Sequence, residues 1–144
     1  MSQTQNNIIL YTDPDGKVSV NVRFAEEDIW LTNNLIAELY ATSRQLIDYH
    51  INNIYSDGEL SQEATCKDFL LVRKEGNRNV ERNLPHYNLD VIIAIGYRVQ
   101  STVAVRFRRW ATQRLHEYIQ KGFALDDERL KQGGNRYFRE LLNR

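Results

Sequence analysis

Residues 31–55 carry the pattern that most restricts the fold of this chain, because it specifies two short helices joined by a tight turn. The inward face of the first helix is apolar at helical spacing: Leu35, Ile36, Leu39 and Tyr40. The turn falls at Ala41-Thr42, and Ser43 is a typical N-cap for the second helix. The inward face of that second helix consists of Ile47, Ile51 and Ile54. Two such helices predict a helix-turn-helix.

The outward face of the second predicted helix is polar and consists of Ser43, Arg44, Gln45, Asp48, Tyr49 and Asn52. In helix-turn-helix proteins the second helix enters the major groove of DNA, where Arg suits guanine and Gln suits adenine. Arg44 and Gln45 are therefore predicted to contact base edges, and Ser43, Tyr49 and Asn52 to contact phosphate or sugar. An ordinary pair of core helices fits the same spacing, so both interpretations stay open.

A β-hairpin is predicted ahead of the helix pair, over residues 7–12 and 17–24. In its second strand, apolar Val18, Val20, Val22 and Phe24 alternate with polar residues that include Arg23. This period of two indicates a strand with one buried face. Asp13-Pro-Asp-Gly16 provides the turn. Residues 25–30 are predicted to lead into the helix pair.

A second hairpin is predicted over residues 67–84, after a polar connection that reaches about residue 65. Its arms are Phe69–Val72 and Asn79–Leu84, and Pro85 is predicted to end it. A hairpin that directly follows a helix-turn-helix is typical of a winged domain. Its tip carries Lys74, Asn77 and Arg78, which are predicted to contact phosphates or a minor groove. A surface turn without a ligand fits this polar tip equally well.

Two supporting helices follow, at about 89–98 and 102–121. The first is apolar nearly all round and predicts a central core helix. The second carries Arg106 and Arg109 on one stripe and is predicted to end in a left-handed cap at Gly122. These arginines are predicted to extend a positive surface, or else to be solvated. The predicted domains are residues 1–123 and the start of a truncated helical extension at 124–144.

The net charge of zero hides an asymmetry. Residues 1–66 contain three basic and ten acidic side chains, whereas residues 67–144 contain sixteen basic and nine acidic ones. Phosphate contacts supply most of the non-specific affinity for DNA. The second predicted helix carries a single arginine, so the contacts that hold DNA are expected from residues 73–82 and 98–114.

Composition argues against several classes of protein. No run approaches the ~18 apolar residues of a membrane span, and residues 1–7 lack the features of a secretory signal. The single cysteine, Cys66, excludes an internal disulfide and suits a reducing compartment, so we expect a cytoplasmic protein. His50, His86 and His116 lie too far apart in sequence for a helical metal motif. We expect no metal, no cofactor and no enzymatic activity.

Eight ordered segments of the chain carry a resemblance to a known family. They are Trp30-Leu-Thr, Ile36-Ala-Glu-Leu-Tyr40, His50-Ile-Asn-Asn-Ile54, Glu75-Gly-Asn-Arg78, Tyr87-Asn-Leu-Asp90, Ile95-Gly-Tyr-Arg-Val99, Phe107-Arg-Arg-Trp-Ala111 and Lys121-Gly-Phe-Ala-Leu-Asp-Asp-Glu-Arg-Leu130. Over roughly residues 28–132 the chain resembles the RhuM family of bacterial genomic islands and prophages, whose members are often labelled virulence proteins. It is also similar, more faintly, to the Bro-N and KilA-N domains of phage antirepressors. That second resemblance implies DNA binding.

The predicted fold is α+β: a winged helix-turn-helix core with an N-terminal hairpin and C-terminal supporting helices. The predicted function is DNA binding, as a transcription regulator or antirepressor-like module of prophage or genomic-island origin. The expected partner is double-stranded DNA, bound by a homodimer because one short helix reads few bases. The rival interpretation is a protein–protein interaction or antitoxin-like module of a longer effector.

Overall fold

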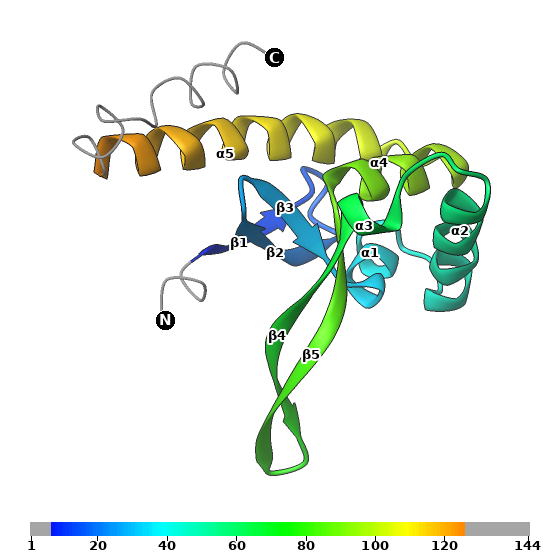
Figure 1. The fold of residues 1–144 in the computed structure, drawn as a ribbon, viewed down its shortest axis with the longest axis horizontal. Helices are drawn as coiled ribbons and strands as arrows, with labels where there is room; N and C mark the ends of the chain where they lie inside the picture. Colours follow the sequence, from blue (N-terminus) through cyan, green and yellow to red (C-terminus); the bar gives the residue numbers. More distant parts are fainter. Residues whose placement is uncertain (1–6, 126–144) are drawn as a thin grey trace.

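Over the described residues, a five-stranded antiparallel sheet in the order β1-β2-β3-β5-β4 forms the centre of an α+β fold that also contains five helices. Figure 1 shows this arrangement. The computed structural model describes residues 7–125, with side chains described over residues 7–119. The strands are β1 (Ile8–Thr12), β2 (Ser19–Ala25), β3 (Asp28–Leu31), β4 (Cys66–Glu75) and β5 (Arg78–Asn88). The helices are α1 (Asn33–Leu39), α2 (Arg44–Ser56), α3 (Gln62–Thr65), α4 (Leu89–Arg98) and α5 (Val103–Leu125).

Helix α5 packs against one face of the sheet through aromatic side chains. Val20, Val22 and Phe24 alternate along β2 and are buried on this face. The rings of Tyr11 and Phe107 meet edge to face with their centroids 5.1 Å apart, and the Trp110 ring lies 5.0 Å from Tyr11. Such aromatic contacts add to the stabilisation that burial gives. Helices α1, α2 and α4 pack beside the sheet and complete the core (Figure 1).

Three helices begin at side-chain caps that the sequence provides. The hydroxyls of Thr32 and Ser43 accept hydrogen bonds from the backbone N–H groups of Leu35 and Leu46, at 3.2 and 3.1 Å. The Asn88 side-chain oxygen accepts from Val91 N–H at 3.3 Å. Each cap satisfies one of the free N–H groups of a first turn. The structure thereby confirms the predicted start of the helix at 44 and of the helix at 89.

The second hairpin is longer than predicted, because β5 continues through Pro85 to Asn88. Strand β3 pairs with β5 only at Tyr87 and Asn88 among the described residues. At Pro85 the outer side of β5 therefore has no strand partner, and a proline is tolerated at such an edge position. The prediction that Pro85 ends the hairpin is wrong for this reason.

Three further predictions of secondary structure need correction. Residues 28–31 form β3, and residues 62–65 form the single turn α3, although both segments were expected to be connections. Helix α5 continues through Gly122 to Leu125, so no cap ends it at that glycine. The remainder of the predicted C-terminal extension lies outside the described residues.

Candidate nucleic-acid interface

The connection between α1 and α2 is a compact helix end. After the last residue of α1, Tyr40 is the C-cap and Ala41 takes a left-handed conformation with φ +54°. The N–H of Thr42 donates to the carbonyl of Ala37 at 2.9 Å, and that of Ala41 donates to Glu38 at 3.2 Å. These two bonds make a Schellman motif, which normally uses glycine at the left-handed position. They turn the chain so that only four residues, 40–43, separate α1 from α2.

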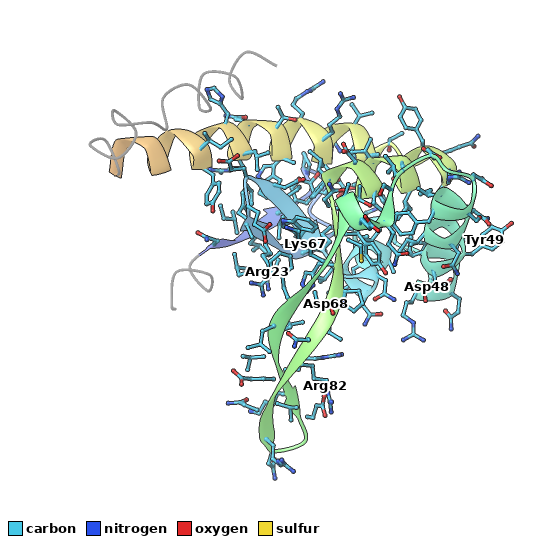
Figure 2. All side chains as sticks on the ribbon, in the orientation of Figure 1. Arg23, Asp48, Tyr49, Lys67, Asp68 and Arg82 are labelled. Carbon is cyan, nitrogen blue, oxygen red and sulfur yellow. The ribbon has the colours of Figure 1, made fainter. Side chains whose placement is uncertain are left out.

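Helix α2 presents a polar face outward because its apolar face is buried. Ile47, Ile51 and Ile54 are at most 4% exposed. The four predicted contact residues on the opposite side are exposed: Arg44, Gln45, Tyr49 and Asn52. Ser43 also lies at this surface, but its hydroxyl is the helix cap. Figure 2 shows Tyr49 directed away from the body of the protein.

Asp48 weakens the positive charge of this surface. Its carboxylate accepts a 2.8 Å hydrogen bond from the Asn33 amide and lies 4.0 Å from the Arg44 guanidinium. Residues 33–65 contain five acidic side chains and one basic one. Helix α2 can therefore supply directional hydrogen bonds, but the positive charge needed to hold a polyanion must come from another element.

The distal half of the β4–β5 hairpin supplies such charge. Residues 73–82 contain four basic and two acidic side chains. Arg73 on β4 pairs with Val80, Glu75 pairs with Arg78, and Leu71 pairs with Arg82. Because residues directly opposite each other point to the same side of a ladder, these pairs share one surface. We call this surface the cationic hairpin face; its charged members are Arg73, Arg78, Arg82 and Glu75.

Two arginines of the cationic hairpin face are available to a ligand. The Arg82 guanidinium donates to both carboxylate oxygens of Glu75, at 2.8 and 2.9 Å, and it lowers the pKa of that carboxyl. Arg73 and Arg78 have no ion pair within the described part of the chain. Lys74 lies on the opposite hairpin face, and Asn77 lies in the turn beside Gly76, which has φ +64°. All three predicted tip residues, Lys74, Asn77 and Arg78, are exposed.

A small second core fixes the root of the hairpin. The ring of Phe69 lies 5.3 Å from both Trp30 and His86, and the Arg23 guanidinium stacks 5.2 Å above it. Arg23 also donates from Nη2 to the carbonyl oxygen of Leu70 at 2.8 Å. Lys67 forms an ion pair with Glu26 beside this core (Figure 2). These contacts join the hairpin to β2 and β3, so its direction is set by the body of the protein.

Sequence reasoning missed this second core. The alternation along β2 placed Arg23 on a solvent face, whereas Arg23 is only 9% exposed. The hairpin root covers it, and periodicity within one strand gives no information about what lies over its second face. His86 is buried beside it, and this burial lowers the pKa of its imidazole.

The two predicted arginines of α5 have different environments. Arg106 donates from Nε and Nη2 to the Asp13 carboxylate, both at 3.0 Å, which lowers the pKa of Asp13 to about 2. Its charge is therefore used within the protein. Arg109 is exposed on the outer side of α5. Helix α5 and the hairpin tip lie at opposite sides of the molecule (Figure 1), so the structure does not bring Arg109 together with Arg78.

Two further observations concern other classes of site. Among the described residues, no group of three or more His, Cys, Asp or Glu side chains is placed to hold a metal ion. No helix in that part of the chain is long and apolar enough to cross a membrane.

Comparison with models of protein families gives a match. The model of the Virulence protein RhuM family matches residues 64–144, from the hairpin root onward. No curated protein and no solved structure matches.

Proposed function

This chain belongs to the virulence protein RhuM family, and we propose that it is a DNA-binding regulatory protein built on a winged helix-turn-helix. In this proposal α2 enters the major groove, and the β4–β5 hairpin is the wing that contacts the adjacent backbone. The observation that carries the proposal is the cationic hairpin face, which projects from the body on a fixed root. The prophage or genomic-island origin of the regulator is part of the same proposal.

The side chains and charges of α2 and of the hairpin suit different contacts with DNA. The N-terminal half of α2 offers Arg44 and Gln45, whose side chains can each make two hydrogen bonds to a purine edge. Arg73, Lys74 and Arg78 offer three cations for phosphates or for the minor groove. The hairpin arms are about 33 Å long at the usual rise per residue, which is enough to follow a duplex backbone. The wing thus supplies affinity and α2 supplies sequence preference.

We propose that the protein acts by binding alone, without catalysis, and that two copies bind one site. A single recognition helix contacts only a few base pairs, so a second copy is needed for a useful degree of specificity. Arg106 is left out of the proposed interface because Asp13 already binds its guanidinium.

A protein-interaction module is the second candidate, and two observations favour it. Residues 33–65 carry five acidic side chains against one basic side chain, a balance that suits a basic protein partner. Leu70 and Val72 are also about half exposed on the hairpin face that carries Lys74. In this second proposal the helix pair and this apolar face would bind a protein, and DNA would not be the ligand.

The deciding measurement is the salt dependence of binding to a random-sequence duplex near 150 mM salt. Each phosphate contact contributes about 0.9 to the slope of log K against log salt concentration. Arg78→Ala is expected to weaken binding and to lower the slope by about one. The matched control is Lys17→Ala, which also removes one exposed cation next to a strand turn, but in the β1–β2 hairpin.

Equal effects of Arg78→Ala and Lys17→Ala would show that only net charge matters. They would reject the proposal that the β4–β5 hairpin contacts DNA as a wing. Absence of binding by the folded wild-type chain even near 50 mM salt would reject DNA as the ligand. A shift in melting temperature, measured for each variant, separates a loss of contact from a loss of fold.

A further inference from the structure

The outer side of α5 carries a second basic surface. A shallow hollow there is lined by one helix face, with residues at intervals of three and four: Val105, Arg108, Arg109, Thr112, Gln113, His116 and Glu117. We call this set, without the terminal Glu117, the α5 outer stripe. Its members from 108 to 116 are polar. The side of α5 that faces the sheet is, by contrast, aromatic and buried.

The α5 outer stripe has unused positive charge. No acidic residue occurs between Asp90 and Glu117 in the sequence. Arg98, Arg106 and Arg114 in this segment each bind a carboxylate, whereas Arg108 and Arg109 have no ion pair among the described residues. Glu117, at one end of the hollow, accepts a 3.2 Å hydrogen bond from Arg114. The two free guanidiniums stand beside hydroxyl and amide groups, a combination that suits phosphate oxygens.

The α5 outer stripe and the tip of the hairpin lie at opposite sides of the molecule (Figure 1). Phe107 and Ala111 face the sheet from α5 and are fully buried, so residues 108, 109, 112 and 113 must face away from it. The β4–β5 hairpin, which is part of the sheet, extends away from α5 (Figure 1). One straight duplex cannot lie against both surfaces. A duplex has a persistence length of about 150 bp, so wrapping a short segment around this small protein is costly.

We propose that the α5 outer stripe binds the phosphate backbone of a second nucleic-acid segment, so that the protein bridges two DNA duplexes. This inference rests on the proposed function, in which α2 and the hairpin bind the first DNA segment. Arg108 and Arg109 make the phosphate contacts, and Gln113 and Thr112 add neutral hydrogen bonds. With two cations and no base-reading element, the stripe binds weakly and without sequence preference. It acts when the hairpin and α2 already hold one duplex.

The test uses two duplexes of different sequence and the full chain. One duplex is fixed to beads, the other is fluorescent and free, and capture of the free duplex by bead-bound protein is measured near 50 mM salt, where weak phosphate contacts persist. Wild-type protein and Lys17→Ala are expected to capture the free duplex. Arg108→Ala/Arg109→Ala is expected to bind the bead duplex within about twofold of wild type near 150 mM salt and to capture at least tenfold less free duplex. Gln113→Glu, which places a negative charge in the stripe, is expected to reduce capture in the same direction.

Equal capture by Arg108→Ala/Arg109→Ala and wild type would overturn the inference. So would a change in oligomeric state of that variant by sedimentation, because it would identify the stripe as a protein interface. Failure of the proposed function gives a different result: Arg78→Ala then binds the bead duplex as wild type does. If, in addition, Arg108→Ala/Arg109→Ala no longer binds the bead duplex, the α5 outer stripe is the main DNA site and bridging is overturned.

Discussion

Asp13 combines a turn position with nearly complete burial, since its side chain is 1% exposed. Its carboxylate accepts a 2.6 Å hydrogen bond from the Tyr11 hydroxyl and two bonds from Arg106. A buried carboxylate needs such partners, because its desolvation is otherwise expensive. Arg106 thereby fastens α5 to the turn between β1 and β2.

The Asp13→Asn variant is expected to lower the free energy of unfolding by about 2 kcal/mol at pH 7. The pKa of Asp13 is about 2 in the folded protein against 3.8 for an ordinary aspartate, so the carboxylate stabilises the fold above pH 4. This contribution is lost as the pH falls from about 4 to 2. Urea unfolding of wild type and Asp13→Asn across that range should therefore converge at low pH. A constant difference between the two proteins would contradict the ion pair as the cause.

Arginine illustrates what can and cannot be predicted for single residues. The exposed positions Arg44, Arg78 and Arg109 are where amphipathic spacing and a turn place them. Arg23 and Arg106 have the same chemistry, yet one is buried under the hairpin root and the other binds Asp13, 93 residues away in sequence. Long-range partners of this kind are set by the tertiary fold. The sequence therefore predicts which residues carry charge, but not how much of that charge a ligand can use.

At the scale of elements, Gly96 determines how closely α4 approaches its neighbours. A Cβ at this position would overlap Ala104 Cβ of α5 and lie 2.7 Å from the hydroxyl oxygen of Tyr40. That hydroxyl donates a 2.6 Å hydrogen bond to the carbonyl of Ile92 and is held in place by it. The helix pair α1–α2 and helix α5 therefore meet α4 at a site where only glycine fits.

The Gly96→Ala variant tests this contact. Alanine in place of glycine favours a helix by about 1 kcal/mol, whereas overpacking of a core costs about 1–3 kcal/mol. We expect the second effect to be larger and the variant to be destabilised by about 1–2 kcal/mol, measured by thermal or urea unfolding. Gly96→Ala/Ala104→Gly moves the methyl group to the other helix and should lose less stability than the two single changes added together. Additive losses would contradict direct contact as the reason.

Elements with a strong local pattern were predictable. The first hairpin, α1, α2 and α4 lie close to their predicted bounds, because alternation, helical spacing and caps act within a few residues. Strand β3 was missed because Ile29, Trp30 and Leu31 are all buried, which removes the alternation. Pro85 misled the prediction because the effect of a proline in a strand depends on whether its outer side is paired.

At the scale of the whole molecule, the fold separates charges that the sequence counts together. The second half of the chain is basic, but in its described part the exposed arginines without an ion pair lie on the hairpin and on the outer side of α5. Three other cations there bind carboxylates of the first half. Arg98, for example, donates to Glu59 at 2.8 Å. Part of the charge asymmetry along the chain is thus a pattern of internal ion pairs. The proposed DNA site depends on the cations that remain without an ion pair at the hairpin. Which cations these are can be known only from the order of the strands in the sheet.

Shortening the hairpin tests whether binding and folding are separate functions of the molecule. Replacing residues 72–81 with Asn-Gly joins Leu71 to Arg82 by a two-residue turn and keeps their pairing. The second core at Phe69 and Leu70 is retained, and the removed residues are mostly exposed. The melting temperature is therefore expected to change by only a few degrees.

Duplex binding by the shortened protein is expected to fall to background near 150 mM salt, because Arg73, Lys74 and Arg78 are removed together. Arg73→Ala/Arg78→Ala in the full-length hairpin is the matched variant, since it removes charge and keeps the ribbon. Similar losses in the two proteins would assign binding to the cations. A larger loss of affinity on shortening would assign part of the duplex binding to the ribbon itself, which reaches along the groove. Wild-type affinity in both would place the DNA site on α2 alone or favour the protein-interaction alternative, because the wing would then contribute nothing to holding the duplex.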